Sequence, residues 1–254
     1  MGFHPLAEQF GAIAGEYERG RPEYPPAAVG ALAAELGIAP GAAVLDLGAG
    51  TGKLSRALLA RGFDVVAVEP APALRQHLTA AIGAERVRDG RAEAIPLADG
   101  SVDAVTVSDA FHWFDHGPAL SEIRRVLRPG GGLAILNTVH DWTGASWADE
   151  VGKLVADSRP QHPNFDGPNW RDSVRAASGF GDPREVRVTA SRPADPERVI
   201  DLLASFSWVA AMSSPQRDAL LARARSVITA GTTPAEFPFH VVIGLAVRVG
   251  PGPS

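Results

Sequence analysis

The chain has 254 residues, of which 45% are hydrophobic, and it carries a formal net charge of −5 and no cysteine. A chain of this size buries a full core in one α/β domain, so we expect a single domain over residues 1–254. The acidic balance argues against nucleic acid or an anionic membrane as a partner, and the lack of cysteine excludes disulfides and thiolate-bound zinc.

Apolar runs alternate with segments of helical periodicity as far as residue 138. Prolines precede several of these helical segments and glycines follow them, as is typical of helix boundaries. Such alternation indicates right-handed βαβ crossovers and a parallel sheet. We predict strands at 43–47, 64–68, 86–88, 102–107 and 133–138, and helices at 27–36, 53–61, 72–82 and 118–127.

The pattern changes after residue 138, where a segment rich in Trp, Asp, Pro and Asn interrupts the alternation. Two late strands without a βαβ connection predict an antiparallel pair at one sheet edge. We place these strands at 185–189 and 240–248, with helices at 196–204 and 215–229. The predicted organisation is an N-terminal cover (1–26), a core (27–139), an insertion with a helix over the acceptor site (140–184) and C-terminal strands and helices (185–249).

The first predicted strand ends in the motif VLDLGAGTGKLS, residues 44–55. Doubly wound sheets bind ligands at this end of the strands, and glycines let the backbone approach a ligand closely. A dinucleotide fingerprint needs glycine where Lys53 stands, and Leu54 rules out a Walker loop. Asp46 in the turn would repel a pyrophosphate and attract an ammonium group. The alternative is a tight strand-to-helix turn without a ligand.

Glu69 ends the second predicted strand, in the sequence VVAVEP. In α/β nucleotide sites an acid at this position accepts hydrogen bonds from ribose hydroxyls. The alternative is a strand-end acid that faces solvent. In either case we expect Glu69 to contribute little to the stability of the fold.

Residues 90–115, GRAEAIPLADGSVDAVTVSDAFHWFD, complete a set of four motifs with the glycine turn, the VEP strand end and LRPGGGLAI. In this order the motifs resemble those of class I S-adenosylmethionine-dependent methyltransferases of the small-molecule type. This similarity covers residues 10–138. The H-W-F element, residues 112–114, resembles that of the trans-aconitate and juvenile-hormone-acid group, which methylates carboxylic acids. The resemblance implies a Rossmann-like fold with a mostly parallel seven-stranded sheet, S-adenosylmethionine as the cofactor, and in-line methyl transfer to a small-molecule acceptor.

The resemblance also implies which residues bind the cofactor, although Arg91 stands where many members have Asp. These are Asp46, Gly48, Ala49, Gly50 and Gly52 at the methionine part, Glu69 and Pro70 at the ribose, Ala92 and Glu93 at the adenine, Ser108 and Asp109 near the methyl group, and Tyr17 and Arg21 near the carboxylate.

His112 and Trp113, in DAFHWFD, are the candidate catalytic residues. His112 would deprotonate a phenol or an amine, or orient a carboxylate, which is already ionised and needs no base. Trp113 would line the acceptor pocket; the alternative for both residues is ordinary packing. His140 is a second candidate. We also expect the aromatic residues of the insertion to cover the acceptor.

No histidine spacing fits a metal site, so we expect no metal. We also expect a cytoplasmic protein, since no apolar run approaches the ~20 residues of a membrane span and the N-terminal stretch is not a signal peptide. The many arginines, with only two lysines, suggest a bacterial source. Two alternatives stay open: a methyltransferase fold that binds the cofactor without methyl transfer and, disfavoured by the glycine spacing, an NAD-dependent oxidoreductase. The sequence does not reveal the acceptor or the oligomeric state.

Overall fold

The computed structural model describes residues 13–143, 146–231 and 236–250. It divides into two compact units, each built from three stretches of chain. Unit 1 comprises Met1–Pro22, Val139–Asp166 and Thr189–His240, and unit 2 comprises Glu23–Thr138, Gly167–Val188 and Val241–Ser254. In chain order the elements are α1 (Ala14–Gly20), α2 (Pro26–Leu36), β1 (Ala43–Leu47), α3 (Lys53–Ala60), β2 (Asp64–Val68), α4 (Pro72–Ile82), η2 (Ala84–Arg86), β3 (Val87–Arg88), β4 (Val102–Ser108), η3 (Phe111–Trp113), α5 (His116–Val126), β5 (Leu127–His140), α6 (Ser146–Ser158), α7 (Pro163–Asp166), α8 (Trp170–Ala176), β6 (Arg184–Pro193), α9 (Pro196–Ala204), α10 (Ser207–Ala210), α11 (Ser214–Ala230) and β7 (Glu236–Val247).

The strands form one seven-stranded sheet in the order β3-β2-β1-β4-β5-β7-β6. The pairs β3-β2, β2-β1, β1-β4 and β4-β5 are parallel. The chain moves outward in one direction from β1 to β3 and in the other direction from β4 through β5 to β6, after which β7 returns to lie between β5 and β6. The reversal falls between β1 and β4, which is where doubly wound sheets bind their ligands. The predicted Rossmann-like α/β fold is confirmed.

The last strand of the chain runs antiparallel to both of its neighbours. The Arg248 N–H donates to the Gly131 carbonyl at 2.8 Å, whereas the Asp141 N–H donates to the Pro238 carbonyl at 3.0 Å. Higher residue numbers in β5 therefore pair with lower numbers in β7. The backbone of Gly181 likewise pairs with Val247. This mixed edge agrees with the predicted antiparallel pair.

The last three strands are longer than predicted. β5 begins at Leu127 rather than at residue 133, with a shift in its register against β4 near Val102 and Ala104. Its first residues pair with the far end of β7 through Gly130 and Gly131. Because this pairing partner lies more than a hundred residues away, local periodicity does not reveal it.

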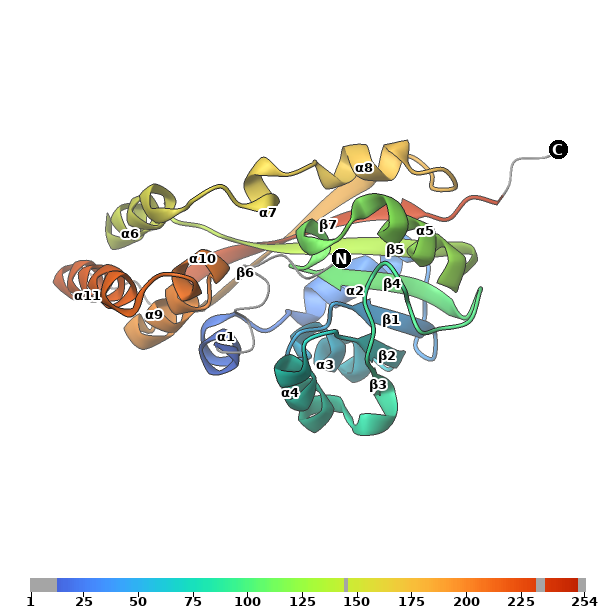
Figure 1. Cartoon of the computed structure of the whole chain (residues 1–254), viewed down its shortest axis with the longest axis horizontal. Coiled ribbons are helices and arrows are strands. Elements are labelled where there is room, and N and C mark those ends of the chain that lie inside the picture. The colour runs from blue at the N-terminus through green and yellow to red at the C-terminus, as the bar shows by residue number, and fades with distance from the viewer. Residues whose placement is uncertain (1–12, 144–145, 232–235, 251–254) are drawn as a thin grey trace. The chain divides into compact units, whose positions relative to one another are not determined.

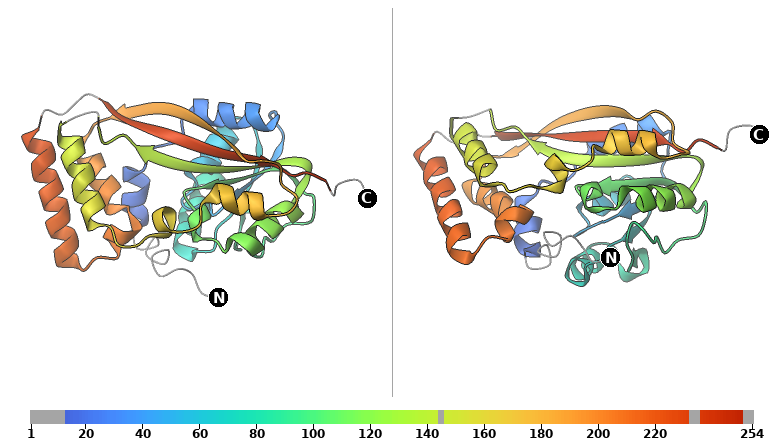
Figure 2. Two further views of the ribbon diagram at one scale, coloured as in Figure 1. Left: turned by 90° about the horizontal axis from the view of Figure 1, so that it is seen from above. Right: turned by 45° about the horizontal axis from the view of Figure 1, so that its top comes forward.

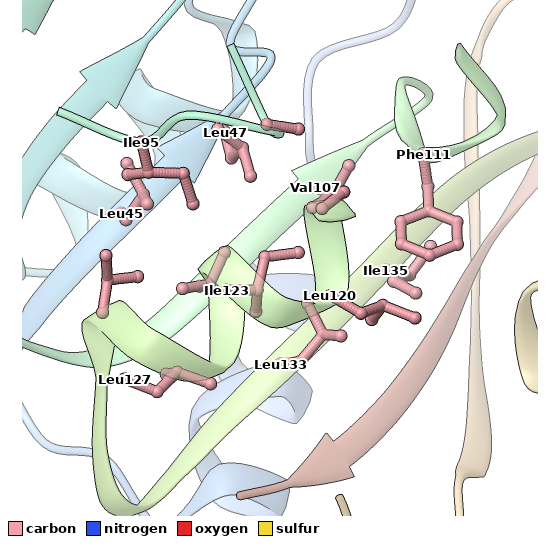
Figure 3. Close-up of a cluster of buried hydrophobic side chains, with 14 of the residues drawn as sticks. Leu45, Leu47, Ile95, Val107, Phe111, Leu120, Ile123, Leu127, Leu133 and Ile135 are labelled. Atoms are coloured by element: carbon pink, nitrogen blue, oxygen red, sulfur yellow. The ribbon is translucent and has the colours of Figure 1, made fainter. Parts of the chain in front are cut away.

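The helices of unit 2 cover a sheet whose side chains alternate between its two faces, as in any β-strand. Leu45, Leu47 and Val107 point to one face, where Leu120 and Ile123 of α5 pack on them (Figure 3). On the other face Ala67 of β2 packs against α4. Figure 1 shows α5 on the opposite side of the sheet from α3 and α4.

Local sequence signals explain where several helices begin and end. Pro26 starts α2, and Gly37 ends it in the left-handed conformation with φ of 65°. Pro72 similarly starts α4. Asp195 caps α9 by accepting a hydrogen bond from the Glu197 N–H at 2.9 Å. Strong local signals of this kind are the reason that these helices were predictable.

Unit 1 has a helical core of its own. α6 and α11 run side by side in Figure 2, and α1 packs on α9. Trp147, Leu202 and Phe237 are among the buried residues that form this core. The predicted insertion therefore contributes α6 and α7 to unit 1 and α8 to unit 2.

Two aromatic residues of the predicted insertion serve hydrophobic cores. Trp147 is 2% exposed in unit 1, and the Trp170 ring of unit 2 packs so closely on Gly244 that a Cβ there would lie 2.5 Å from it. Trp147 is thus buried and Trp170 partly buried against these cores, and a role of either in covering an acceptor stays a prediction. Trp142 is partly buried against the core of unit 1, and Phe165 is exposed.

The single domain over residues 1–254 stays a prediction, because compact units are not by themselves independently folding domains. The first part of the predicted N-terminal cover, residues 1–12, lies outside the described residues. The same holds for residues 144–145 of the predicted insertion.

Candidate active site

The glycine turn after β1 carries three residues with positive φ: 70° at Gly48, 58° at Gly50 and 91° at Gly52. The N–H groups of Gly48 and Ala49 donate to the Val68 carbonyl at 2.8 and 3.2 Å, which ties the turn to the end of β2. A Cβ added at Gly48 or Gly52 would lie 2.9 Å from a neighbouring side chain. At Gly50 it would meet no described atom within 4 Å. Gly50 is therefore the open position of the turn, the one with unoccupied space beside it.

Glu69 joins the end of β2 to this turn. One of its carboxylate oxygens accepts a hydrogen bond from the Gly50 N–H and the other accepts one from the Ala71 N–H, both at 2.9 Å. The side chain is 5% exposed, and burial raises its pKa. Glu69 is thus a built part of the turn, unlike the solvent-facing acid that was one reading of its sequence. Each oxygen keeps a second lone pair for a ligand hydroxyl.

Asp46 lies on the β1 face that α3 covers, and it is fully buried. Its oxygens accept hydrogen bonds from the Ser55 hydroxyl of α3 at 2.5 Å and from the Thr106 hydroxyl of β4 at 3.3 Å. Burial raises the pKa of Asp46 to about 6, against the opposing effect of these hydrogen bonds. The carboxyl group therefore links β1 to α3 and β4 by hydrogen bonds. Its contact with a ligand ammonium stays a prediction.

Ser108 and Asp109 end β4 beside β1. The buried Tyr24 hydroxyl hydrogen-bonds to the Ser108 hydroxyl and donates to an Asp109 carboxylate oxygen at 3.4 Å. The other Asp109 oxygen accepts from the Thr138 N–H at 3.0 Å. Asp109 has φ of 48°, a conformation that is uncommon for a residue with a side chain and is found most often at functional turns.

Ala92 and Glu93, the two residues of the predicted adenine loop, have different roles in the structure. Ala92 is 3% exposed and packs into the core cluster under α5. Glu93 accepts a hydrogen bond from the Asp115 N–H at 2.9 Å. It therefore fixes the position of the segment between η3 and α5, next to His112 and Trp113.

His112 and Trp113 lie on the short helix η3, directly after the end of β4. Their rings are 4.6 Å apart between centroids and are inclined at 51°. Both side chains are half-buried, whereas the neighbouring Phe111 is buried in the core. The structure thus separates a buried packing residue of this element from two that are partly exposed.

Tyr17 and Arg21 belong to unit 1. The Arg21 guanidinium lies 5.5 Å from the Tyr17 ring centroid, and its Nε–H donates to the Ser205 hydroxyl at 3.0 Å. Their position beside the cofactor carboxylate stays a prediction. In unit 2 the structure brings together the other predicted positions around the ends of β1, β2 and β4.

Several residues that support this site were not predicted from the sequence. Ser55 and Thr106 hold Asp46, and Tyr24 holds the end of β4. Lys53, which is 5% exposed at the start of α3, donates to Glu23 at 2.7 Å. The spacing of Asp46 and Ser55, across the turn to the first turn of α3, is the one signal that could have suggested a contact.

Comparison with known proteins identifies the family. The profile of a methyltransferase domain matches residues 45–135, which span the glycine turn, Glu69, the predicted adenine loop and η3. An uncharacterized methyltransferase of Mycobacterium bovis is 42% identical over 226 residues, 88% of this chain and 86% of that one. The chain belongs to the methyltransferase family.

Solved structures show the same fold. One is designated a candidate type II methyltransferase of Anaeromyxobacter dehalogenans; it is 27% identical, with a TM-score of 0.59 over 90% of this chain and 97% of that one. Another is phosphoethanolamine N-methyltransferase 2 of Haemonchus contortus in complex with phosphomonomethylethanolamine and S-adenosylhomocysteine. It is 19% identical, with a TM-score of 0.51 over 87% of this chain and 52% of that one. At that identity it shows the fold alone.

The described part of this methyltransferase shows no group of three or more His, Asp or Glu side chains that could hold a metal ion. Across the same residues, no helix has the length and apolar character that crossing a membrane requires. The narrower resemblance to the trans-aconitate and juvenile-hormone-acid group stays a prediction.

Proposed function

We propose that this methyltransferase uses S-adenosylmethionine to methylate a small-molecule acceptor, on a carboxylate or hydroxyl oxygen. The observation that carries the proposal is the hydrogen bond between the Glu69 carboxylate and the Gly50 N–H. This hydrogen bond joins the acid that follows β2 to Gly50, the open position of the glycine turn. A nucleoside with an amino-acid tail needs both features, an acid for its ribose and a bare backbone for the tail.

The residues present fit this cofactor. Gly50 leaves space where any side chain would stand, and the turn follows β1 at the reversal of the strand order. Glu69 retains lone pairs for two hydroxyl groups. The turn lacks the third glycine of a dinucleotide fingerprint, with Lys53 in its place. The Haemonchus enzyme of the same fold was solved with the demethylated cofactor, which supports the choice further.

S-adenosylmethionine supplies an electrophilic methyl group on a cationic sulfur. The task of the protein is then to bind the two reactants and align them, which is worth up to about 7–11 kcal/mol when the geometry is favourable. Glu69 would bind the ribose and Gly50 would admit the tail. His112 and Trp113, which lie on η3 beside the end of β4, would hold the acceptor.

The role of His112 depends on the acceptor. A carboxylate oxygen is ionised at neutral pH, so His112 would orient it without moving a proton. A phenol would require His112 to take its proton at an imidazole nitrogen. The charge of −5 is consistent with a small-molecule acceptor rather than a nucleic acid.

The test is calorimetric titration of the full chain with S-adenosylhomocysteine and, separately, with NAD. We expect a dissociation constant in the micromolar range for the first and no binding of the second. Incubation with methyl-labelled S-adenosylmethionine and a panel of acids, phenols and amines then tests the transfer. Cofactor binding with no transfer to any class would favour a protein that binds the cofactor for another purpose. Binding of NAD alone would overturn the proposal.

A further inference from the structure

Buried nitrogen atoms without a hydrogen-bond partner gather in unit 1. Most buried polar atoms of proteins are paired, so such a group requires an explanation. Among the described residues, all the buried side-chain nitrogens and oxygens that lack a partner belong to this unit. They are His140 Nε2, Trp147 Nε1, Arg192 Nε and Nη2, Trp208 Nε1 and Arg217 Nε.

Arg192 of β6 provides two of these atoms. Its side chain belongs to a residue that is only 8% exposed, and its Nη1 donates to the Gly20 carbonyl. Nε and Nη2, the atoms of the opposite edge, find no acceptor among the residues that the structure describes. The N–H bonds of this edge are parallel, and their spacing matches the two oxygens of a carboxylate.

Three of these five residues lie near the ring of Phe237. The Arg192 guanidinium lies 5.8 Å from its centroid, the His140 ring 5.7 Å and the Trp147 ring 5.5 Å. Trp142 lies 5.2 Å from the same ring. The surroundings are therefore aromatic, with hydrogen-bond donors and one fixed positive charge.

The charges around this group favour a single negative ligand. Burial lowers the pKa of Arg192 to about 10, with further lowering by Arg198 and Arg21 and an opposing effect of Asp195. Arg192 is thus still protonated at neutral pH. Burial, Arg21 and Arg192 hold the pKa of His140 well below its usual value, so its ring is neutral. A buried cation without a counter-ion is costly, and an anion would remove that cost.

We propose that Arg192 and His140 bind a carboxylate group of a small organic acid, with both carboxylate oxygens on the Nε–Nη2 edge of Arg192. A neutral His140 completes the site with one N–H donor.

The experiment uses the full chain without cofactor. Succinate is titrated calorimetrically and in thermal melts, against sodium chloride at equal ionic strength. At a hundredfold excess over its dissociation constant, succinate should raise the melting midpoint by about 5–10 °C. The test variant is Arg192→Met. The matched control is Arg223→Met, since Arg223 is an exposed arginine of the same unit.

Arg192→Met should lose the response to succinate, and without ligand it should melt at a higher temperature than the natural protein, because it removes an unpaired buried charge. Arg223→Met should keep the full response. Arg192→Lys keeps the charge but lacks the two parallel N–H donors of the guanidinium. It should weaken succinate binding by at least about tenfold. Lysine also serves if the methionine variant does not fold.

Three results would overturn the proposal. Succinate could fail to stabilise the natural protein, as expected if only water occupies these donors. Arg192→Lys could bind succinate as well as the natural protein does. Arg192→Met could lose affinity for S-adenosylhomocysteine while keeping it for methylthioadenosine, which lacks the carboxylate; the carboxylate site would then belong to the cofactor. None of these outcomes depends on observing methyl transfer.

Discussion

Replacing Asp46 by asparagine should stabilise the protein at neutral pH, although it removes a charged group from the centre of the sheet. Asp46 is fully buried, and its carboxyl group is held by the Ser55 and Thr106 hydroxyls. An asparagine can accept the Ser55 hydrogen bond with its carbonyl oxygen and donate to the Thr106 oxygen with its amide. The substitution therefore keeps the geometry and removes the ionisation.

The size of this stabilisation follows from the pKa of Asp46. Burial raises it from 3.8 to about 6 in the folded protein. Between these two pH values the folded state binds more protons than the unfolded state, so stability falls as the pH rises. Two pKa units correspond to about 3 kcal/mol. This contribution is fully present below about pH 4 and is lost by about pH 7.

Urea unfolding of the natural protein and of Asp46→Asn at intervals from pH 4.5 to 8 measures the effect. We expect the variant to gain relative stability as the pH rises, up to about 3 kcal/mol at pH 7. The pKa of Glu69 is also raised by burial, but Glu69 titrates in both proteins and largely cancels in the difference. Asp64→Asn, at an exposed position of β2, is the control and should change stability by less than about 0.5 kcal/mol at every pH.

The reasoning would be refuted by a variant that is less stable than the natural protein at pH 7 and shows the same pH dependence. That outcome would mean that Asp46 stays ionised when folded and that its charge strengthens the hydrogen bonds from Ser55 and Thr106 by more than burial costs.

Glu69→Gln should weaken S-adenosylhomocysteine binding by about 1.5–3 kcal/mol in calorimetry, the range for hydrogen bonds to a charged group; an unchanged affinity would leave Glu69 with a structural role only. Glu69→Ala should in addition lower the free energy of unfolding in urea by about 1–3 kcal/mol, because it leaves the Gly50 and Ala71 N–H groups unpaired. His112→Gln should reduce turnover by about 10²–10⁴ if the acceptor is a phenol or amine and should remove the rising limb of the pH–rate profile, whereas partial activity with an unchanged profile indicates an orienting role. Trp113→Ala should raise the KM for the acceptor and leave the Kd for S-adenosylhomocysteine within about twofold; equal losses in both would contradict an acceptor-side position.

The elements that the sequence predicts best are those specified locally. β1, β2, α4 and α9 have the predicted bounds, because apolar runs, prolines and glycines mark their limits. The start of β7 was placed four residues too late, since its first residues pair with distant parts of the chain. α10 was not predicted; its four residues carry no periodicity of their own.

The candidate site was likewise predicted only where local sequence motifs specify it. Motif spacing placed Gly50 and Glu69 at adjoining strand ends, and the structure joins them by a hydrogen bond. The two backbone hydrogen bonds that Glu69 accepts were not predicted, because the donors come from two different turns and no sequence pattern shows that they converge. Arg192 was missed because its partners in unit 1 come from elements more than forty residues away in the chain. Burial of a lone arginine in such a strand has no signature in one sequence.

The two compact units interleave along the chain, and this bears on how the protein can be synthesised. The chain passes from one unit to the other after residues 22, 138, 166, 188 and 240. Multidomain proteins commonly fold one domain after another as the chain leaves the ribosome. Here unit 1 is incomplete until residue 240 has emerged, and unit 2 still needs the strand residues that follow. Neither unit can be expressed as one continuous fragment. A nascent chain of 200 residues still lacks about a fifth of the sequence, so its apolar strands stay uncovered until that part has been synthesised.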